Sequence, residues 1–173
     1  PLEEDVIQGV NMYQSNDYDG IITLGGGSAM DVAKTIRFMV AHKSPLSQYD
    51  DALGGDAKIV HPMPPLFAIP TTAGTGSEVG RSSVITIKDT GRKTIFFHPN
   101  LIPDIAVLDP ALTVGLPPYI TVATGMDAFT HCMEAFLVDS LHPMADAIAL
   151  EGMKMIIENL PKVIDNPKDL DAR

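Results

Sequence analysis

The chain has 173 residues, in which 12 Lys and Arg stand against 22 Asp and Glu, so its formal net charge is −10. This acidic balance argues against a nucleic-acid-binding protein and against electrostatic attachment to anionic lipid. Apolar residues make up 45% of the sequence and charged residues 20%, which excludes a disordered chain and allows a buried core. Cys132 is the only cysteine, so an intrachain disulfide is excluded and a reducing, cytoplasmic location is expected.

The length predicts one domain to one and a half, at roughly 150 residues per domain. No apolar run reaches the roughly 18 residues of a membrane span, and no secretory signal opens the chain, so no membrane partner is expected. The sequence begins with Pro1 rather than Met and ends in the polar stretch 165–173. We therefore expect an internal piece of a longer protein.

The first strong signal is a strand that runs into a glycine turn. Residues 20–27 (GIITLGGG) contain an apolar, β-branched run followed by three consecutive glycines, and a helix is expected to follow. Ser28 and Asp31 have the spacing of a capping box, with Asp in place of Glu. Strand, tight turn and helix N-terminus together form an architecture that binds phosphate through free backbone N–H groups. The expected apolar face of this helix comprises Ala29, Ala33, Ile36 and Val40.

The middle of the chain is expected to hold short strands between turns. Residues 44–65, rich in Pro, Gly and Asp, are typical of a loop. The predicted strands are 66–69, 83–87, 93–97 and 105–108. The turn 89–91 (DTG) joins the second and third of these into a hairpin. To this point the pattern is that of an α/β domain.

Beyond Asp109 helical periodicity replaces glycine turns. One helical stripe comprises Val122, Met126, Phe129, Met133 and Phe136. A second helix is expected to begin at Pro143 and to stop before Pro161. We place a domain boundary near 110–116.

Two turns are candidates for binding a nucleotide. The glycine turn departs from the dinucleotide fingerprint, because Met30 stands where the third glycine belongs. The turn 71–77 (TTAGTGS) follows a buried strand and offers four hydroxyls and two glycines. Each turn also has an ordinary structural interpretation, in which hydroxyls satisfy the turn backbone and Asp31 is a helix N-terminal acid. Their joint occurrence favours a nucleotide site.

Asp127 and His131 are the candidate metal ligands. They lie four residues apart on a predicted helix, so both side chains project from one face. A surface ion pair is the alternative. The flanking apolar stripe predicts that this helix is buried, and a buried Asp and His require each other, a metal, or both. The remaining histidines lie near loops without ligand spacing and are expected at the surface, and Cys132 is expected to be a small buried thiol.

Three motifs in this order resemble the iron-dependent (group III) alcohol dehydrogenase family: residues 25–31 (GGGSAMD), 70–78 (PTTAGTGSE) and 125–131 (GMDAFTH). Residues 103–110 (PDIAVLDP) and the double proline at 117–118 support the match. The resemblance covers nearly the whole chain, and the ordered set is highly specific. It implies a Rossmann-like α/β domain with a β-hairpin over residues 1–112, which binds NAD or NADP, followed by the start of an all-helical metal-binding domain over 113–173.

The resemblance also implies roles for individual residues. Gly26, Gly27 and Ser28 would face the cofactor pyrophosphate, and Asp31 would lie near the nicotinamide. The other implied cofactor neighbours are Thr71, Thr72, Thr75, Ser82, Lys93 and Leu112. Asp127 and His131 match the first two ligands of a divalent metal, Fe²⁺ by family and Zn²⁺ as an alternative. The family's N-terminal segment and its two further histidine ligands are not among these residues.

The implied activity is interconversion of a small primary alcohol and its aldehyde by hydride transfer with the nicotinamide, in a homo-oligomer. One alternative is a related enzyme of the same superfold, such as a zinc-dependent glycerol dehydrogenase or a dehydroquinate synthase. An alternative of another class is a catalytically silent, truncated nucleotide-binding fragment. We expect residues 1–173 alone to be inactive.

Overall fold

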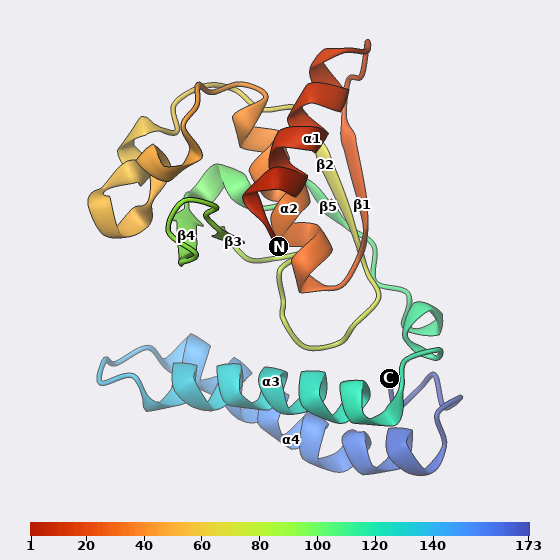
Figure 1. Cartoon of the computed structure of the whole chain (residues 1–173). Coiled ribbons are helices and arrows are strands. Elements are labelled where there is room, and N and C mark those ends of the chain that lie inside the picture. Colours follow the sequence, from red (N-terminus) through yellow and green to blue (C-terminus); the bar gives the residue numbers. More distant parts are fainter. The chain divides into compact units, whose positions relative to one another are not determined.

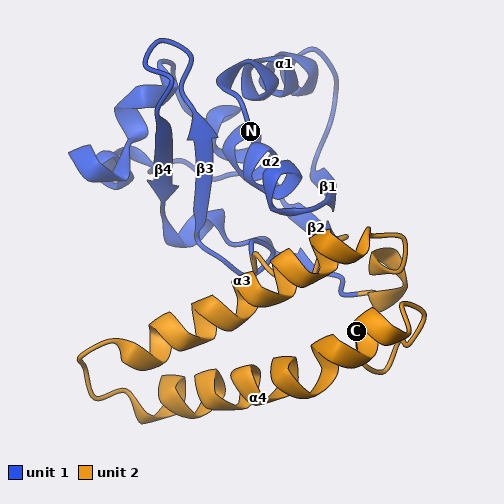
Figure 2. Cartoon of the chain, turned by 60° about the horizontal axis from the view of Figure 1, so that its bottom comes forward, with its two compact units in different colours: residues 1–70, 77–108 blue, residues 71–76, 109–173 orange.

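The computed structural model describes all residues 1–173 and divides them into two compact units (Figure 2). Unit 1 comprises residues 1–70 and 77–108, and unit 2 comprises residues 71–76 and 109–173. The chain therefore leaves unit 1 after the second strand for six residues and returns at Ser77. Each unit is described by itself.

Unit 1 is built on a parallel sheet of three short strands, in the order β1-β2-β5 (Figure 1). The strands are β1 (Ile21–Gly25), β2 (Leu66–Pro70) and β5 (Ile105–Ala106). Ile21 pairs with Leu66 and Phe67 with Ile105, so the carboxyl ends of β1 and β2 lie side by side. Helices α1 (Glu3–Gln14) and α2 (Gly27–Met39) lie on one side of this sheet (Figure 1).

An antiparallel hairpin completes unit 1. Its strands are β3 (Ser82–Thr86) and β4 (Lys93–Phe97), and Gly91 in the connecting turn has a φ of 63°. Phe38 of α2 contacts Phe96 of β4 in the main core. The core also includes Val6, Met39, Leu46, Tyr49, Ile59, Ile85, Ile87 and Leu101.

The expected α2 face is only partly correct. Ala33 is buried, but Ala29 is exposed, and Met30 and Phe38 are fully buried. The reason is that α2 packs against α1, the sheet and β3 together, so it buries more than one stripe of its surface. The predicted capping box is wrong: the N-cap is Gly26, without a side-chain cap, and the Asp31 carboxylate bonds elsewhere.

Two features of unit 1 differ from the sequence prediction. The segment 44–65 contains three short 3₁₀ turns rather than irregular loop alone. Helix α1 was not predicted, because Val6 and Val10 are its main contacts with the core and two residues make a weak periodic signal. The four predicted strands are all present, although β5 is shorter than expected.

Unit 2 is a pair of helices, α3 (Pro118–Leu137) and α4 (Pro143–Asp165). Glycines permit their close approach, because a Cβ at Gly152 would lie 2.7 Å from the Cys132 sulfur. The prediction that α4 stops before Pro161 is wrong, since the helix continues through it. Proline there removes one hydrogen bond, to the carbonyl of Ile157, whose residue is largely exposed.

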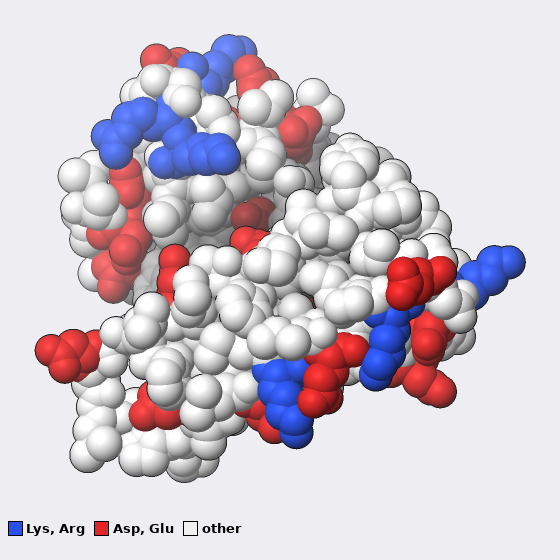
Figure 3. Space-filling view, turned by 90° about the horizontal axis from the view of Figure 1, so that it is seen from below, with Lys and Arg blue, Asp and Glu red and all other residues white.

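The predicted burial of α3 is also wrong for this chain. Val122, Met126 and Phe136 are each about two-fifths exposed, at 39%, 46% and 40%. A two-helix pair has only one shared face, so the rest of the apolar stripe is left in solvent. Figure 3 shows the result as a broad area without charged side chains over these helices.

The parallel sheet with its hairpin and the helical C-terminal part confirm the expected fold class. What the ranges 1–112 and 113–173 bind stays a prediction. No helix of the chain combines the length and apolar character needed to cross a membrane.

Candidate functional site

The turn between β1 and α2 is the first part of the site. Gly25 ends β1 with a φ of 155°, and a Cβ there would lie 2.7 Å from the Cβ of Ala29. Gly26 is the N-cap, no side chain caps the helix, and no acidic residue lies in the first turn. The first backbone N–H groups of α2 are therefore not taken by a side-chain cap, and the helix dipole favours an anion there.

Asp31 bonds to the segment Ser77–Val84, which leads into β3 and includes its first three residues. Its Oδ1 accepts a hydrogen bond from the Ser77 hydroxyl at 2.8 Å, and its Oδ2 accepts one from the Val84 N–H at 3.1 Å. Burial raises the pKa of Asp31, while these two hydrogen bonds and the charge of Lys34 oppose that rise. The carboxylate is thus engaged with protein donors through both oxygens.

Lys34 is a charged residue that sequence reasoning missed. It is fully buried, and its Nζ donates to the carbonyl oxygens of Gly80 and Ser82, each at 2.9 Å. Burial lowers the pKa of Lys34 to about 8, against the attraction of Asp31 and Glu78. Its one available signal was position: Lys34 lies three residues after Asp31, on the same side of α2.

Ser82 and Lys93 lie at opposite ends of the hairpin. Ser82 pairs with Phe97, and Lys93 pairs with Thr86. Four residues of strand, at about 3.4 Å each, separate the two positions by roughly 13 Å. They cannot both contact one phosphate, so a ligand that touches both must be extended.

The predicted threonines lie in unit 2, in the segment 71–76. Gly74 is packed tightly there, because a Cβ would lie 2.5 Å from the Thr124 carbonyl oxygen of α3. The Thr72 hydroxyl is buried without a hydrogen-bond partner, whereas Thr75 is exposed. Thr71 is half-buried and Leu112 is 40% exposed. An unpaired buried hydroxyl fits a ligand-binding turn.

Asp127 and His131 lie one turn apart on α3, as predicted. His131 Nε2 and Asp127 Oδ1 are 3.8 Å apart, and the side chains are 52% and 47% exposed. Metal–ligand bonds of about 2.0–2.1 Å at a tetrahedral angle place two ligand atoms about 3.3 Å apart, which a small side-chain rotation achieves. The spacing of the pair therefore fits two ligand positions of a divalent metal ion. The predicted burial of Asp127 and His131 is wrong, because both side chains reach solvent, so burial does not oblige them to bind each other or a metal.

No cluster of three or more His, Cys, Asp or Glu residues in the chain is arranged to hold a metal ion. His42, expected at the surface, is half-buried instead: its Nε2 accepts hydrogen bonds from the N–H groups of Val60 and His61, and its Nδ1 contacts the Phe38 carbonyl. Cys132 is half-buried and free.

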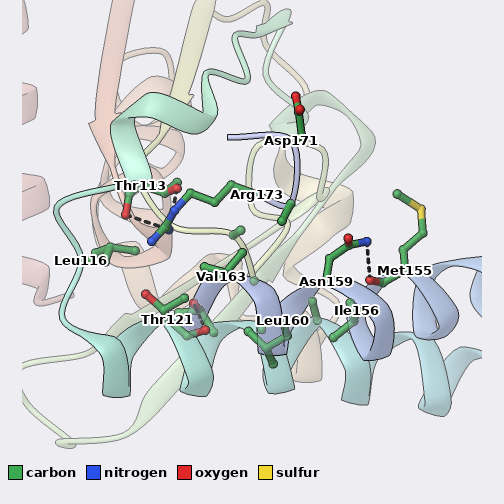
Figure 4. Close-up of a pocket in the computed structure, with 16 residues that line it drawn as sticks. Thr113, Leu116, Thr121, Met155, Ile156, Asn159, Leu160, Val163, Asp171 and Arg173 are labelled. Carbon is green, nitrogen blue, oxygen red and sulfur yellow. Dashed lines mark hydrogen bonds between the residues drawn. The ribbon is translucent and has the colours of Figure 1, made fainter. Parts of the chain in front are cut away.

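Unit 2 also contains a pocket with a volume of about 330 Å³. Thr121 and Thr124 of α3 and Asn159 of α4 contribute polar groups to a largely apolar lining. The Arg173 side chain reaches Thr113 and donates to both its carbonyl and hydroxyl oxygens (Figure 4). None of the predicted metal or cofactor residues lines this pocket.

Comparison with known proteins identifies the family. The family model described as iron-containing alcohol dehydrogenase matches residues 1–110, and the model of the C-terminal part of the same family matches residues 121–173. The chain belongs to the iron-containing alcohol dehydrogenase family. Both the α/β unit and the helical pair are thus parts of one known enzyme fold.

Relatives within this family match the whole chain. A 4-hydroxybutyrate dehydrogenase from Cupriavidus necator is 43% identical over 173 residues, which are 100% of this chain and 45% of that protein. The crystal structure of a 1,3-propanediol oxidoreductase matches with a TM-score of 0.93 and 35% identity, over 99% of this chain and 44% of that one.

The structure of a sulfoacetaldehyde reductase from Bifidobacterium kashiwanohense, in complex with NAD⁺, has a TM-score of 0.88 and 32% identity over 99% of this chain and 45% of that one. The chain therefore spans less than half the length of the relatives that it matches.

Proposed function

We propose that this chain carries the cofactor turn and half of the metal site of an NAD(P)-dependent alcohol dehydrogenase. The reaction is interconversion of a small primary alcohol and its aldehyde by hydride transfer. The named relatives that act on 4-hydroxybutyrate, 1,3-propanediol and sulfoacetaldehyde support this substrate class.

The observation that carries the proposal is the turn from β1 into α2. A parallel strand ends in Gly25, and a helix of 13 residues begins directly after it with an uncapped N-terminus and no first-turn acid. Backbone N–H groups at Gly27 and Ser28 are suited to bind the pyrophosphate, and Gly26 adds no side chain that would exclude it. Asp31 would lie near the nicotinamide, and Ser82, in the segment Ser77–Val84 that bonds to Asp31, would also lie along the cofactor.

Asp127 and His131 would hold a divalent metal through one carboxylate oxygen and one imidazole nitrogen. The family description points to iron, and Zn²⁺ binds such a donor set as well or better. When bound, the metal supplies Lewis-acid polarisation of the substrate oxygen and the nicotinamide supplies or accepts the hydride. In this proposal, unit 1 contributes the N-terminus of α2 for the cofactor, and unit 2 contributes two metal ligands from α3.

Because residues 1–173 alone are expected to be inactive, turnover of the whole protein that contains them, reconstituted with metal, tests this proposal. We expect reduction of NAD⁺ or NADP⁺ with short primary alcohols to depend on added Fe²⁺ or Zn²⁺. Asp127→Ala and His131→Ala should each lower kcat/KM by at least about 100-fold, because each removes a metal ligand. Glu151→Ala, an exposed acid on α4 that pairs with Lys154, is the matched control and should have no effect.

Wild-type rates in the Asp127→Ala and His131→Ala variants would end the metal proposal. Absence of turnover in the whole wild-type protein, together with tight NADH binding, would favour the silent nucleotide-binding alternative. Absence of both would contradict the proposed function as a whole.

A further inference from the structure

Three neighbouring side chains of α2 attach one segment of unit 1 at five positions. Asp31 bonds to Ser77 and Val84, and Lys34 bonds to the carbonyls of Gly80 and Ser82. The Thr35 hydroxyl lies 3.0 Å from the hydroxyl of Ser83, and both residues are fully buried. The segment Ser77–Val84 is therefore bound to α2 by polar side chains at five positions, and we call this set of contacts the clamp.

Among these three side chains, Lys34 costs the most free energy to bury. A lysine ammonium without solvent must recover its lost hydration from protein acceptors. Two carbonyl oxygens at 2.9 Å and the attraction of Asp31 and Glu78 provide that compensation. Glu78 Oε2 is itself buried without a hydrogen-bond partner, so the local charge balance depends on Lys34. An apolar side chain in its place would be cheaper to bury but would leave both carbonyls unpaired.

The attached segment carries one residue of the proposed cofactor site. It begins at Ser77 and contains Ser82 at the start of β3. The helix to which it is attached begins at the glycine turn. Lys34 itself, being fully buried, has no surface with which to contact a ligand.

We propose that Lys34 is a positioning residue for the nicotinamide half of the cofactor, because it holds the carbonyls of Gly80 and Ser82 and so fixes the segment Ser77–Val84 beside Asp31. This inference rests on the proposed function, which places Asp31 near the nicotinamide. The pyrophosphate would bind at the N-terminus of α2, which the contacts of Asp31, Lys34 and Thr35 with the segment Ser77–Val84 do not include, so binding of ADP would not depend on the clamp.

Comparison of the affinities for NADH and ADP separates a positioning role of Lys34 from general destabilisation of the fold, which would weaken both. In Lys34→Met, a substitution of similar length without donors, we expect the affinity for NADH to fall at least about tenfold, as for the loss of charge-assisted hydrogen bonds. The affinity for ADP should stay within about twofold of wild type. Hydrogen exchange of the amides of 77–84 should accelerate, while that of α1 stays unchanged.

Ser77→Ala provides a second test with little risk to folding, because it removes one hydroxyl from the same clamp. It should change NADH affinity and exchange in the same direction as Lys34→Met, by a smaller factor. Lys88→Met is the matched control, since Lys88 is an exposed lysine that pairs with Glu4. It should leave NADH affinity, ADP affinity and the exchange of 77–84 unchanged.

Equal losses of NADH and ADP affinity in Lys34→Met would overturn the positioning role, because they would show a general structural effect. Unchanged exchange of 77–84 would overturn the clamp itself. If the wild type binds neither NADH nor ADP, the proposed function fails, and the exchange experiment still decides whether Lys34 holds the segment.

Discussion

At the residue scale, two buried cations on α2 organise unit 1. Lys34 holds the segment before β3, and Arg37 holds the segments around β2 and β5. Arg37 donates to the carbonyls of Pro64, Asn100 and Ile102 and to the Asp104 carboxylate, at 2.7 to 3.1 Å. Asp104 also accepts from the Leu66 N–H at 2.8 Å, so one ion pair ties together the starts of two strands. Sequence reasoning could not predict these roles, because the acceptors are mostly backbone carbonyls distant in the chain.

Removal of the Arg37 guanidinium should be strongly destabilising. We expect Arg37→Gln to lower the free energy of unfolding by about 3 kcal/mol, because the Asp104 carboxylate and three carbonyls lose their donor. Urea denaturation measures this change. Arg92→Gln, at an exposed position on the hairpin turn, should change the free energy by less than about 0.5 kcal/mol. A loss of that small size in Arg37→Gln would show that the network contributes little.

Burial of Lys34 predicts a pH dependence of stability with a defined sign. Its pKa falls from 10.5 to about 8 on folding, so between these values the unfolded chain binds more protons than the folded chain. The free energy of unfolding of wild type, relative to that of Lys34→Met, should therefore rise as the pH increases from 8 to 10.5. Paired urea titrations at pH 7, 8.5 and 10 measure the difference, in which the other lysines cancel. A difference that stays flat or falls would contradict the buried, perturbed amine.

At the element scale, the sequence correctly predicted the strands, turns and helix starts that depend on local sequence signals. The apolar run into Gly25 predicted β1 and the start of α2, and the turn 89–91 predicted the hairpin, because glycine positions and β-branched runs act locally. The errors arose where tertiary packing decides: α2 buries several sides, α4 continues through Pro161, and the α3 stripe is exposed. Asp127 and His131 were predictable as a pair because helical spacing alone brings them together.

The contact between the segment 71–76 and α3 predicts that a side chain at Gly74 is not tolerated. A Cβ at Gly74 would lie 2.5 Å from the backbone oxygen of Thr124, and helix backbone cannot move aside as a flexible side chain can. We expect Gly74→Ala to lower the free energy of unfolding by about 2 kcal/mol. Gly115→Ala is the matched control, because nothing lies within 4 Å of the added Cβ. Thermal unfolding of the two variants compares them, and equal midpoints would contradict the close approach.

At the scale of the whole molecule, each unit leaves a large apolar face uncovered. In unit 1 the sheet face opposite α2 carries two rows of apolar side chains that run across the strands. One row is Ile22, Phe67 and Ile105, and the other is Leu24, Ile69 and Val107. Ile22 is 73% exposed and Leu24 62%. Parallel sheets are normally covered on both faces, so these rows form an incomplete interface. Such exposure accords with a chain that spans 45% of the length of a relative.

These uncovered faces predict that the 173-residue chain binds apolar dyes and associates with itself. We expect enhanced fluorescence of anilinonaphthalene sulfonate and a mass above that of the monomer in light scattering at micromolar concentration. Ile22→Lys with Ile105→Lys should reduce both signals and leave the circular dichroism unchanged, because the two side chains already lie largely in solvent. A monomer that does not bind the dye would contradict the prediction that these apolar faces bind ligands or a second copy of the chain.

The central claim is that the N-terminus of α2 binds the pyrophosphate of a nicotinamide cofactor, and Ser28→Asp tests it most directly. An acid in the first turn stabilises the helix through its dipole, yet it repels a phosphate at the same place. Titration of NADH fluorescence should show saturable binding to wild type and at least tenfold weaker binding to Ser28→Asp, about the cost of one like-charge contact. Ser47→Asp, at an exposed site remote in sequence, should bind as wild type does. Equal NADH affinity in wild type and Ser28→Asp, or no binding by the wild type, would contradict the account.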